Sequence, residues 1–389
     1  MRVYDTLSRR LVPLPLARVD GRPLLRLYVC GVTPYESGHM GHAFTFCSFD
    51  VLVRHLEAKG VVVKYVQNVT DVDDPLFERA RRDGVDWKDL AEREQAALVR
   101  DMARLGWRPP DLMPRVSEEI PGILAAAEAL AAKGFAYHAA DGTLYFDASR
   151  YAGFGRLSGR SRRSMLAKLK DEELLGAKGP GAKRDWLDFP LWRPSGPGEP
   201  AWASAYGVGR PGWHIECSAM AMRHLGEQVE VHGGGRDLVF SHHESERAQS
   251  ESLTGCVPFA KAWLHVGLVR YQGRKMSKSL GNLVNIRQAL ERASPAGLRV
   301  YLAAHHYRRD WGFTWAGLES AERLVRRVAA LPLDAHPSPE LAAAFDAALD
   351  ADLDTPAAIR VLRRAVAMKD GSEARRMLDV LAGSASLDP

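Results

Sequence analysis

The chain has 389 residues, of which 46% are hydrophobic and 26% are charged, and its formal net charge is +5. This length corresponds to about two or three domains, and this composition excludes a disordered, collagen-like or coiled-coil chain. No apolar run of about 18 residues and no signal-peptide pattern at the N-terminus is present, which predicts a cytoplasmic protein without a membrane span.

The first pattern along the chain predicts a β-α-β unit. An apolar strand at 24–30 leads through a turn at 31–34 into a helix from about residue 42, and a β-branched strand at 61–69 follows Gly60. The helix is predicted from apolar side chains spaced by three and four, namely Ala43, Phe46, Phe49, Val53 and Leu56. Such a unit implies a parallel sheet with a right-handed crossover.

The later elements follow from the same reasoning. Residues 75–137 are rich in Ala, Leu, Glu and Arg and predict helices. Gly and Pro are dense from 153 to 212, which indicates an irregular insertion between two half-sheets and not a second core. After residue 282 the pattern is helical to the end, with a break at 331–339. Between these regions we expect a helix at 213–225, a strand at 228–232, a glycine turn at 233–235, a helix at 241–253 and a strand at 262–271.

One segment, 151–170, is strongly basic and contains no acidic residue. Its positive charges alone exceed the net charge of the chain. They are Arg156, Arg160, Arg162, Arg163, Lys168 and Lys170. Such a segment is either a solvated loop or a surface that faces phosphate or nucleic acid.

The sequence His39-Met40-Gly41-His42 lies in the turn before the first crossover helix. Unpaired N–H groups and the helix dipole make a helix N-terminus an anion site. Gly41 lets a ligand approach the backbone, and the two imidazoles can donate to phosphate oxygens. The alternative is a pair of surface histidines whose hydrogen bonds are satisfied elsewhere.

A second motif is Lys275-Met276-Ser277-Lys278-Ser279, between Gly273 and Gly281. A loop with two lysines and two hydroxyls is suited to clamp a polyphosphate as charge develops. The alternative is an exposed basic loop without a ligand.

Four residues have side chains suited to metal binding. The chain has four cysteines, at 30, 47, 217 and 256, which are too few and too scattered for a disulfide framework in a cytosolic chain. Two thiolates from Cys30 and Cys217, the imidazole of His242 and the carboxylate of Glu246 form a plausible zinc set, because 242 and 246 share a face of the predicted helix. The alternative is that each cysteine simply belongs to the core.

The first two motifs together resemble the signature of class I aminoacyl-tRNA synthetases, over most of the chain. Further segments in order resemble the cysteinyl-tRNA synthetase family: Tyr28-Val29-Cys30-Gly31, Asn68-Val69-Thr70-Asp71-Val72-Asp73-Asp74, Gly212-Trp213-His214-Ile215-Glu216-Cys217, His232-Gly233-Gly234-Gly235 and His242-His243-Glu244. The resemblance implies an α/β fold, a Rossmann (HUP-like) parallel-sheet catalytic domain with an insertion between its halves and a C-terminal α-helical bundle. We expect its parts at 1–115, 116–210, 211–290 and 291–389.

The resemblance also implies a zinc ion at the floor of the amino-acid pocket, one per chain, held by Cys30, Cys217, His242 and Glu246. Serine differs from cysteine by one atom, and an apolar pocket discriminates poorly between such molecules. Zinc binds a thiolate and lowers its pKa, whereas a serine hydroxyl gains little. Cysteine could therefore be selected without an editing domain.

The implied reaction begins with attack of the cysteine carboxylate on the α-phosphate of ATP, assisted by Mg²⁺. His39, His42, Lys275 and Lys278 would stabilise the phosphates. The nucleotide would contact Gly41, Gly235, Asp237, Val269 and Lys278. L-cysteine or its adenylate would contact Gly31, Thr33, Thr45, Asn68, Thr70 and Trp213. In the second step an acceptor amine displaces AMP, and Asp71 or a neighbouring acid is the candidate base.

The acceptor divides two related families. Several features resemble the cysteine ligase of mycothiol biosynthesis, whose acceptor is the aminosugar glucosaminyl-inositol. They are the sequence 33–35, the segments 74–80, 83–87 and 352–356, and the end of the chain at 389. Other features point instead to a synthetase that charges tRNA. They are Glu246, the sequences 241–246 and 248–251, and the lack of a glycine-rich segment at 183–193. Ser241 stands where both families usually have proline. We expect the aminosugar; the alternatives are tRNA(Cys) or another acceptor, or an inactive RNA-binding relative. A plain nucleotidylyltransferase would share only the first motif.

Overall fold

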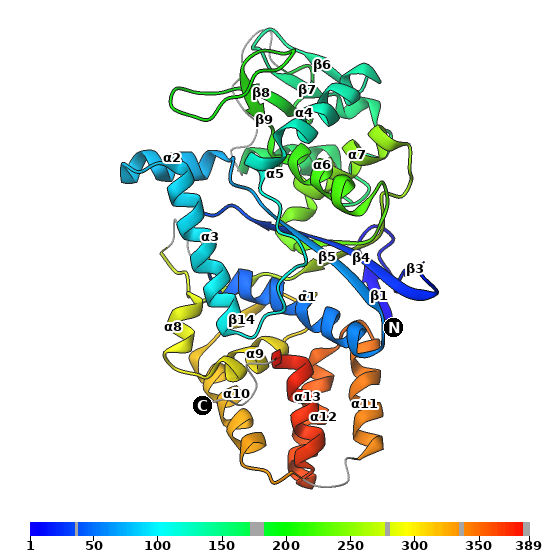
Figure 1. The fold of residues 1–389 in the computed structure, drawn as a ribbon, viewed down its shortest axis with the longest axis vertical. Coiled ribbons are helices and arrows are strands. Elements are labelled where there is room, and N and C mark those ends of the chain that lie inside the picture. Colours follow the sequence, from blue (N-terminus) through cyan, green and yellow to red (C-terminus); the bar gives the residue numbers. More distant parts are fainter. Residues whose placement is uncertain (36–37, 172–182, 277–280, 334–337, 384–389) are drawn as a thin grey trace.

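The computed structural model describes residues 1–35, 38–171, 183–276, 281–333 and 338–383. Its central sheet crosses the middle of the molecule (Figure 1). Four parallel strands stand in the order β5-β4-β10-β11, and a short antiparallel strand, β3, pairs with the start of β4. The bounds are β3 (Ala17–Val19), β4 (Arg22–Val32), β5 (Val62–Val69), β10 (Val229–Gly235) and β11 (Ala260–Val266). The parallel β-α-β unit is confirmed.

The two halves of the sheet are wound in opposite directions. Helix α1 (Met40–Ala58) connects β4 to β5, and α7 (His242–Thr254) connects β10 to β11. Helix α1 packs into the apolar core below the sheet, whereas α6 (Trp213–Leu225) and α7 lie on the face above it (Figure 1). Because the neighbouring strands β4 and β10 lead to helices on opposite faces, a crevice opens beyond their carboxyl ends, which is where ligands bind in such sheets.

Helices predicted at 75–137 are present. They are α2 (Asp74–Asp83), α3 (Trp87–Arg104) and α4 (Val116–Ala132). Helix α2 begins because Asp73 accepts a hydrogen bond from the Asp74 N–H, and it ends at Gly84, whose φ is 65°. A hairpin not foreseen from the sequence, β1 (Arg2–Asp5) and β2 (Arg10–Pro13), precedes the sheet.

The insertion is more regular than its Gly and Pro content indicated. Four antiparallel strands cross it, namely β6 (Ala136–His138), β7 (Leu144–Phe146), β8 (Phe189–Pro194) and β9 (Gly209–Pro211), with η1 (Ala148–Arg150) and α5 (Arg162–Asp171). The prediction of an irregular segment was wrong because strands of three to six residues are too short to show alternation. Phe146, Leu191 and Trp192 pack in the same apolar cluster as α6, so this sheet shares the core above the central sheet.

The C-terminal part lies below the central sheet (Figure 1). Its helices are α8 (Ile286–Leu290), α9 (Pro295–Ala303), α10 (Trp315–Ala329), α11 (Pro339–Asp350), α12 (Thr355–Met368) and α13 (Gly371–Ala382). Helix α10 ends and α11 begins on either side of the predicted break. A small sheet of β12 (Val269–Tyr271), β13 (Arg274–Lys275) and β14 (Trp311–Phe313) was not predicted. The strand expected at 262–271 is two strands, because the pairing is interrupted at Gly267, whose N–H donates instead to the Tyr307 carbonyl at 2.6 Å.

A buried ion pair fixes α1 to this helical part. Asp50 of α1 and Arg299 of α9 are both fully buried and form an ion pair. Arg299 Nε also donates to the Leu381 carbonyl of α13 at 2.9 Å. The helix that begins at the first histidine motif is therefore held by charge as well as by apolar packing. Within the described residues, no helix has the length and apolar character needed to cross a membrane. The four expected domain boundaries remain predictions.

Candidate active site

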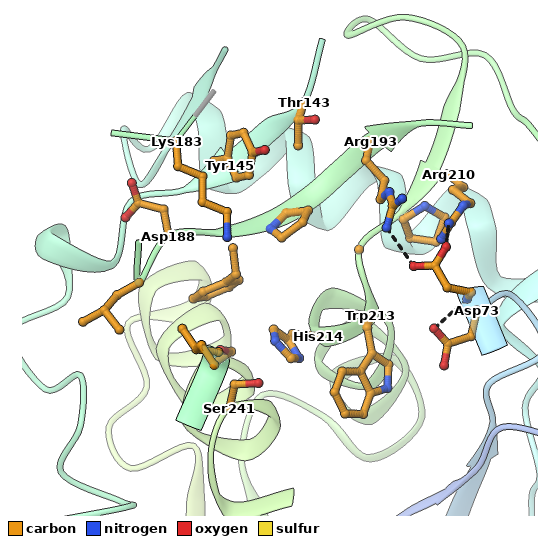
Figure 2. A pocket seen from close by; sticks show the side chains of 18 of the residues that line it. Asp73, Thr143, Tyr145, Lys183, Asp188, Arg193, Arg210, Trp213, His214 and Ser241 are labelled. Carbon is orange, nitrogen blue, oxygen red and sulfur yellow. Dashed lines mark hydrogen bonds and ion pairs between the residues drawn. The ribbon is translucent and has the colours of Figure 1, made fainter. Parts of the chain in front are cut away.

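Two cavities adjoin at Trp213, the first residue of α6. The larger, of about 350 Å³, lies between the sheet of the insertion and the starts of α6 and α7 (Figure 2). The smaller, of about 210 Å³, lies at the carboxyl end of β4. Trp213 lines both cavities, so molecules bound in the two would be neighbours.

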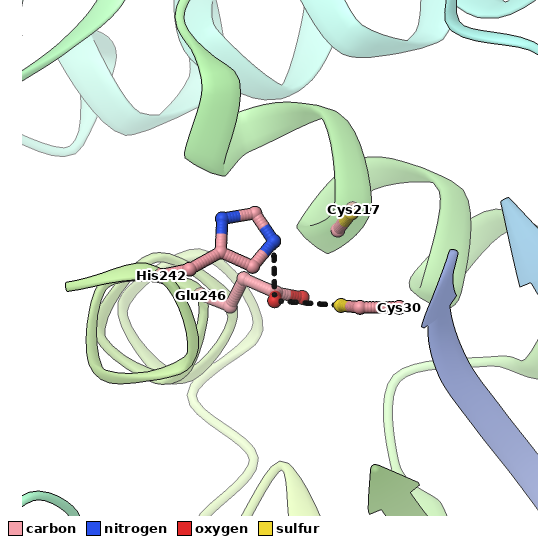
Figure 3. Close-up of side chains that lie close together, drawn as sticks. All are labelled: Cys30, Cys217, His242 and Glu246. Carbon is pink, nitrogen blue, oxygen red and sulfur yellow. Dashed lines mark hydrogen bonds and ion pairs between the residues drawn. The ribbon is translucent and has the colours of Figure 1, made fainter. Parts of the chain in front are cut away.

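Four potential metal ligands gather beside the smaller cavity (Figure 3). Cys30 comes from the end of β4 and Cys217 from α6, while His242 and Glu246 stand one turn apart on α7. All four are buried, and their ligand atoms lie within 4.8 Å of one another. Glu246 Oε1 lies 3.0 Å from His242 Nε2 and 3.3 Å from Cys30 Sγ. The structure thus brings the four predicted residues together, and two sulfurs, an imidazole and a carboxylate suit zinc.

The charges of these groups balance one another. Burial opposes a thiolate at Cys217, but the Cys30 thiol that donates to it and the His242 imidazolium lower its pKa to about 6. Burial also opposes an imidazolium at His242, yet Glu246 and the Cys217 thiolate raise its pKa to about 10. Burial and the hydrogen bond to Cys217 raise the pKa of Cys30 well above its usual value. Metal binding at such a group would displace protons from His242 and Cys30.

Further imidazoles surround Glu246. Cys30 and Glu246 also form a second potential metal group with His232 and His243. His232 Nε2 lies 3.3 Å from Glu246 Oε2, and His243 Nδ1 lies 2.7 Å from His265 Nε2. Burial opposes a negative charge on Glu246. His232 and His242 nevertheless lower the pKa of Glu246 well below its usual value. In the sequence, His232 and His243 stand within motifs that assign no role to either side chain.

Helix α7 is polar along its length and nevertheless buried. All of its residues from 242 to 252 are buried. Glu244 accepts from the Ser158 N–H at 2.8 Å, and Glu251 accepts from the Phe259 N–H at 3.2 Å. The polar side chains therefore serve the interior of the molecule, which the hydropathy of the segment does not indicate.

The walls of the smaller cavity contain most of the residues predicted for substrate and phosphate. Those that line it are Gly31, Thr33, His39, His42, Asn68, Thr70 and Trp213, together with Val32, Tyr35 and Leu238, which were not predicted. Gly31 N–H donates to Asn68 Oδ1 at 2.9 Å, and a Cβ at Gly31 would lie 1.7 Å from the Asn68 carbonyl oxygen. Only glycine allows β4 and β5 to meet so closely here.

His39 caps the N-terminus of α1. Its Nδ1 accepts from the Gly41 N–H at 3.0 Å, so that the proton of a neutral ring stays on Nε2 and can be donated. The rings of His39 and His42 stack with centroids 3.9 Å apart. Burial and the nearby His39 lower the pKa of His42 well below its usual value, so His42 is neutral at pH 7. Both rings line the cavity and can serve as hydrogen-bond donors to an anion.

The second motif is only partly described. Lys278 and the side chain of Lys275 lie outside the described residues; the backbone of Lys275 pairs with Arg270 in the small sheet. On the far side of the motif, residues 39 and 285 pair in an isolated bridge, and the Met40 N–H donates to the Val284 carbonyl at 2.9 Å. The chain that follows the second motif is therefore joined to the start of α1.

The predicted nucleotide contacts are more dispersed. Gly235 ends β10, and Asp237 in η2 (Arg236–Val239) lines a separate cavity of about 590 Å³. Arg160 and Lys168 of the basic segment line that cavity too. Val269 is buried in β12, and Thr45, which was predicted to contact L-cysteine, is half-buried on α1. Neither these residues nor Gly41 line the two cavities that meet at Trp213.

The carboxylate suggested as a base has a structural partner. Asp71 accepts from the Ser117 N–H at 2.9 Å and from the Ser117 hydroxyl, at the first turn of α4, and it lines neither of the two cavities. Asp73, two residues later, lines the larger one. The sequence placed both acids in one motif, but could not show which of them faces a cavity.

Comparisons with known proteins identify the family of the chain. The family model of the tRNA synthetases class I (C) catalytic domain matches residues 19–323. A Cysteine--tRNA ligase of Dehalococcoides mccartyi is 44% identical over 332 residues, which are 84% of this chain and 69% of the relative. An L-cysteine:1D-myo-inositol 2-amino-2-deoxy-alpha-D-glucopyranoside ligase of Thermomonospora curvata is 46% identical over 345 residues, 88% of this chain and 83% of the relative.

Solved structures show the same fold at low identity. The methionyl-tRNA synthetase of Mycobacterium tuberculosis in complex with methionyl-adenylate has a TM-score of 0.63 at 15% identity, over 92% of this chain and 89% of its own. The LeuRS ternary complex of Agrobacterium radiobacter has a TM-score of 0.65 at 12% identity, over 93% and 84%. With the family model matching most of its length, this chain belongs to the class I (C) tRNA synthetase family, a family of ligases.

Proposed function

We propose that this protein activates L-cysteine with ATP to form cysteinyl-AMP and then transfers the cysteine to the amine of the aminosugar glucosaminyl-inositol. The observation that carries the first step is the group of four buried ligands beside a cavity whose wall holds His39 and His42. Relatives from both ligase families carry names in which cysteine is the amino acid that is ligated.

The metal in this proposal is zinc, one ion per chain. Cys30, Cys217, His242 and Glu246 would hold it, and their fit rests on the clustering of four buried ligand atoms of the types that zinc prefers. A zinc ion held there supplies a Lewis acid that favours a thiolate over a serine hydroxyl. The protein's own contribution is to bury the four ligands, and the rings of Trp213 and His242 stack with their centroids 4.3 Å apart.

In the first step the cysteine carboxylate oxygen bonds to the α-phosphorus of ATP, and pyrophosphate leaves. No protein nucleophile is needed, since positioning and charge stabilisation carry such reactions. His39 Nε2–H and His42 would donate to phosphate oxygens, with Lys275, Lys278 and Mg²⁺ completing the stabilisation. Asn68, Thr70 and Thr45 would contact the amino acid, while Gly41, Gly235, Asp237 and Val269 would contact the nucleotide.

The aminosugar is supported by relatives from Thermomonospora curvata and from Parafrankia sp., which is 44% identical over 363 residues. The second candidate acceptor is tRNA(Cys). It is favoured by Glu246, since a carboxylate at this position resembles the synthetase ligand set, and by the equally similar Cysteine--tRNA ligases.

The first test is ATP–pyrophosphate exchange with cysteine, with serine as the competing amino acid. We expect exchange with cysteine only. Cys217→Ser should lower bound zinc and selectivity for cysteine together, whereas the matched variant Cys256→Ser, outside the group, should change neither. Absence of exchange in the native protein would end the proposal, and retained selectivity in Cys217→Ser would end the zinc assignment.

The second test separates the acceptors. Amide formation with glucosaminyl-inositol is compared with charging of tRNA(Cys) at equal enzyme concentration. Charging without amide formation would replace the aminosugar by tRNA and leave the activation step in place.

A further inference from the structure

Of the residues assigned above to the activation of cysteine, only Trp213 is among the described residues that line the larger cavity. This cavity lies beyond Trp213, on the side of the insertion (Figure 2). Its volume of about 350 Å³ falls within the range of about 300–1,000 Å³ typical of small-molecule sites. Because Trp213 also lines the smaller cavity, a molecule bound in the larger one would lie next to one bound in the smaller one.

Asp73 stands at the partition between the cavities. The carboxylate lines the larger cavity, and its Oδ2 accepts from the hydroxyl of Thr33, which lines the smaller one, at 2.9 Å. Its Oδ1 accepts from the Asp74 N–H at 2.9 Å. Burial raises the pKa of Asp73 to about 6, although the hydrogen bond from Thr33 opposes the shift. The carboxylate is thus ionised at pH 7 and more basic than an ordinary aspartate.

The other acids of this cavity are occupied. Asp74 pairs with Arg193 at 2.9 Å and with Arg210. Asp188 accepts from the Tyr137 hydroxyl at 2.7 Å and from two backbone N–H groups. Asp141 accepts from the Thr143 N–H and from the Tyr145 hydroxyl, both at 2.9 Å. Within the described residues, Asp73 forms no ion pair, and of these four acids it is the one that accepts a hydrogen bond from a residue of the smaller cavity, Thr33. It is therefore the acid of this cavity best placed to accept a proton from a bound molecule.

The far end of the cavity is polar and holds the cation Lys183 beside the carboxylates of Asp141 and Asp188. Lys183 extends into the cavity from the insertion, across from Asp73 and Trp213 (Figure 2). Its Nζ lies 5.9 Å from the centroid of the Tyr145 ring. Burial lowers the pKa of Lys183. Hydroxyls of Thr143 and Tyr145 line the same end. An ammonium group, two hydroxyls and an aromatic face match a polyhydroxylated molecule better than an apolar one.

We propose that the larger cavity binds the acceptor as a polyhydroxylated amine, with its hydroxyls at Lys183 and Tyr145 and its amine at Asp73. This inference rests on the proposed function and adds the acceptor subsite and its base. The nitrogen of the neutral amine bonds to the carbonyl carbon of cysteinyl-AMP. The bond from that carbon to the phosphate oxygen breaks, and AMP leaves with the electron pair. The proton lost by the nitrogen passes to Asp73 Oδ2 and then to water.

The test measures the two half-reactions separately. Asp73→Asn keeps the N-cap of α2, because asparagine also caps helices, and removes the base. Transfer from preformed cysteinyl-AMP to glucosaminyl-inositol should fall by about 10²-fold or more, while ATP–pyrophosphate exchange is retained. Lys183→Ala should raise the acceptor KM by about 10-fold, the loss of one charged hydrogen bond, with little change in kcat.

Two controls isolate the subsite. Lys170→Ala removes an exposed cation of the insertion that does not line the cavity, and it should change neither half-reaction. Hydroxylamine, a small nucleophile without a polyol, should trap cysteinyl-AMP equally well in the native protein and in Lys183→Ala.

The outcomes are distinct. If the native protein shows no exchange, the proposed function fails and the subsite fails with it. If exchange is present but transfer is unchanged in Asp73→Asn and Lys183→Ala, only the subsite is wrong. If Asp73→Asn loses exchange and transfer in parallel, Asp73 is structural and the assignment of the base is overturned.

Discussion

The buried pair of Asp50 and Arg299 gives a quantitative test of how α1 is held in place. Both side chains are fully buried. Asp50 also accepts hydrogen bonds from Arg54 Nε at 3.1 Å and from the Arg108 N–H at 2.9 Å. Arg299, in contrast, has a single carboxylate partner among the described residues. Asp50→Asn preserves shape and leaves the Arg299 cation without a counter-charge. Such a loss costs about 3–5 kcal/mol.

Removing the cation of this pair should lower the free energy of unfolding by less than removing the carboxylate. In Arg299→Met the Asp50 carboxylate keeps Arg54 and the Arg108 N–H, so its charge remains compensated. The double variant should recover part of the loss of Asp50→Asn, because an apolar residue can replace one member of a buried pair when both charges are gone. Urea unfolding followed by tryptophan fluorescence measures these differences.

Asp346→Asn is the matched control. This carboxylate is 42% exposed and lies 3.6 Å from Arg376, so its removal should cost at most about 1 kcal/mol. If Asp50→Asn costs no more than Asp346→Asn, charge does not hold α1 to the C-terminal helices and the reasoning fails.

Two further predictions concern the site and the pH dependence. Gly31→Ala should abolish cysteine-dependent exchange, because its Cβ would lie 1.7 Å from the Asn68 carbonyl oxygen and push β4 from β5; wild-type exchange in this variant would show that the strands adjust without cost. The free energy of unfolding should decrease as the pH falls from about 7 to 5, since burial lowers the pKa of His42 and of His305 in the folded state and the unfolded chain takes up the protons. Urea midpoints at the two pH values measure this, and a His305→Gln variant with an undiminished pH dependence would contradict the contribution of that residue.

Much of the central fold was predictable because its signals are local. The spacing of three and four along α1 and the β-branched run of β5 each fall within one element, and together they imply a parallel sheet. The strands of the insertion and β14 have six residues or fewer, which is too short for periodicity. Their pairing depends on partners that are far away in the sequence.

The candidate site was predictable where motifs stand at strand ends. Cys30 and Gly31 lie near the end of β4, His39 caps the start of α1, and parallel strands bring such ends to one edge of the sheet. The larger cavity was not predictable, because Asp73, Lys183 and Trp213 come from three separate segments. The choice between Asp71 and Asp73 also needed the structure, since the two differ only in which partner each meets.

The burial of α7 has a consequence for how this chain tolerates mutation. Its serines, glutamates and histidines would be taken for solvent-facing positions that can be varied freely, yet residues 242–252 are all buried. A saturation library should therefore find this polar helix about as restrictive as the hydrophobic interior, and the exposed positions of α2 far more permissive.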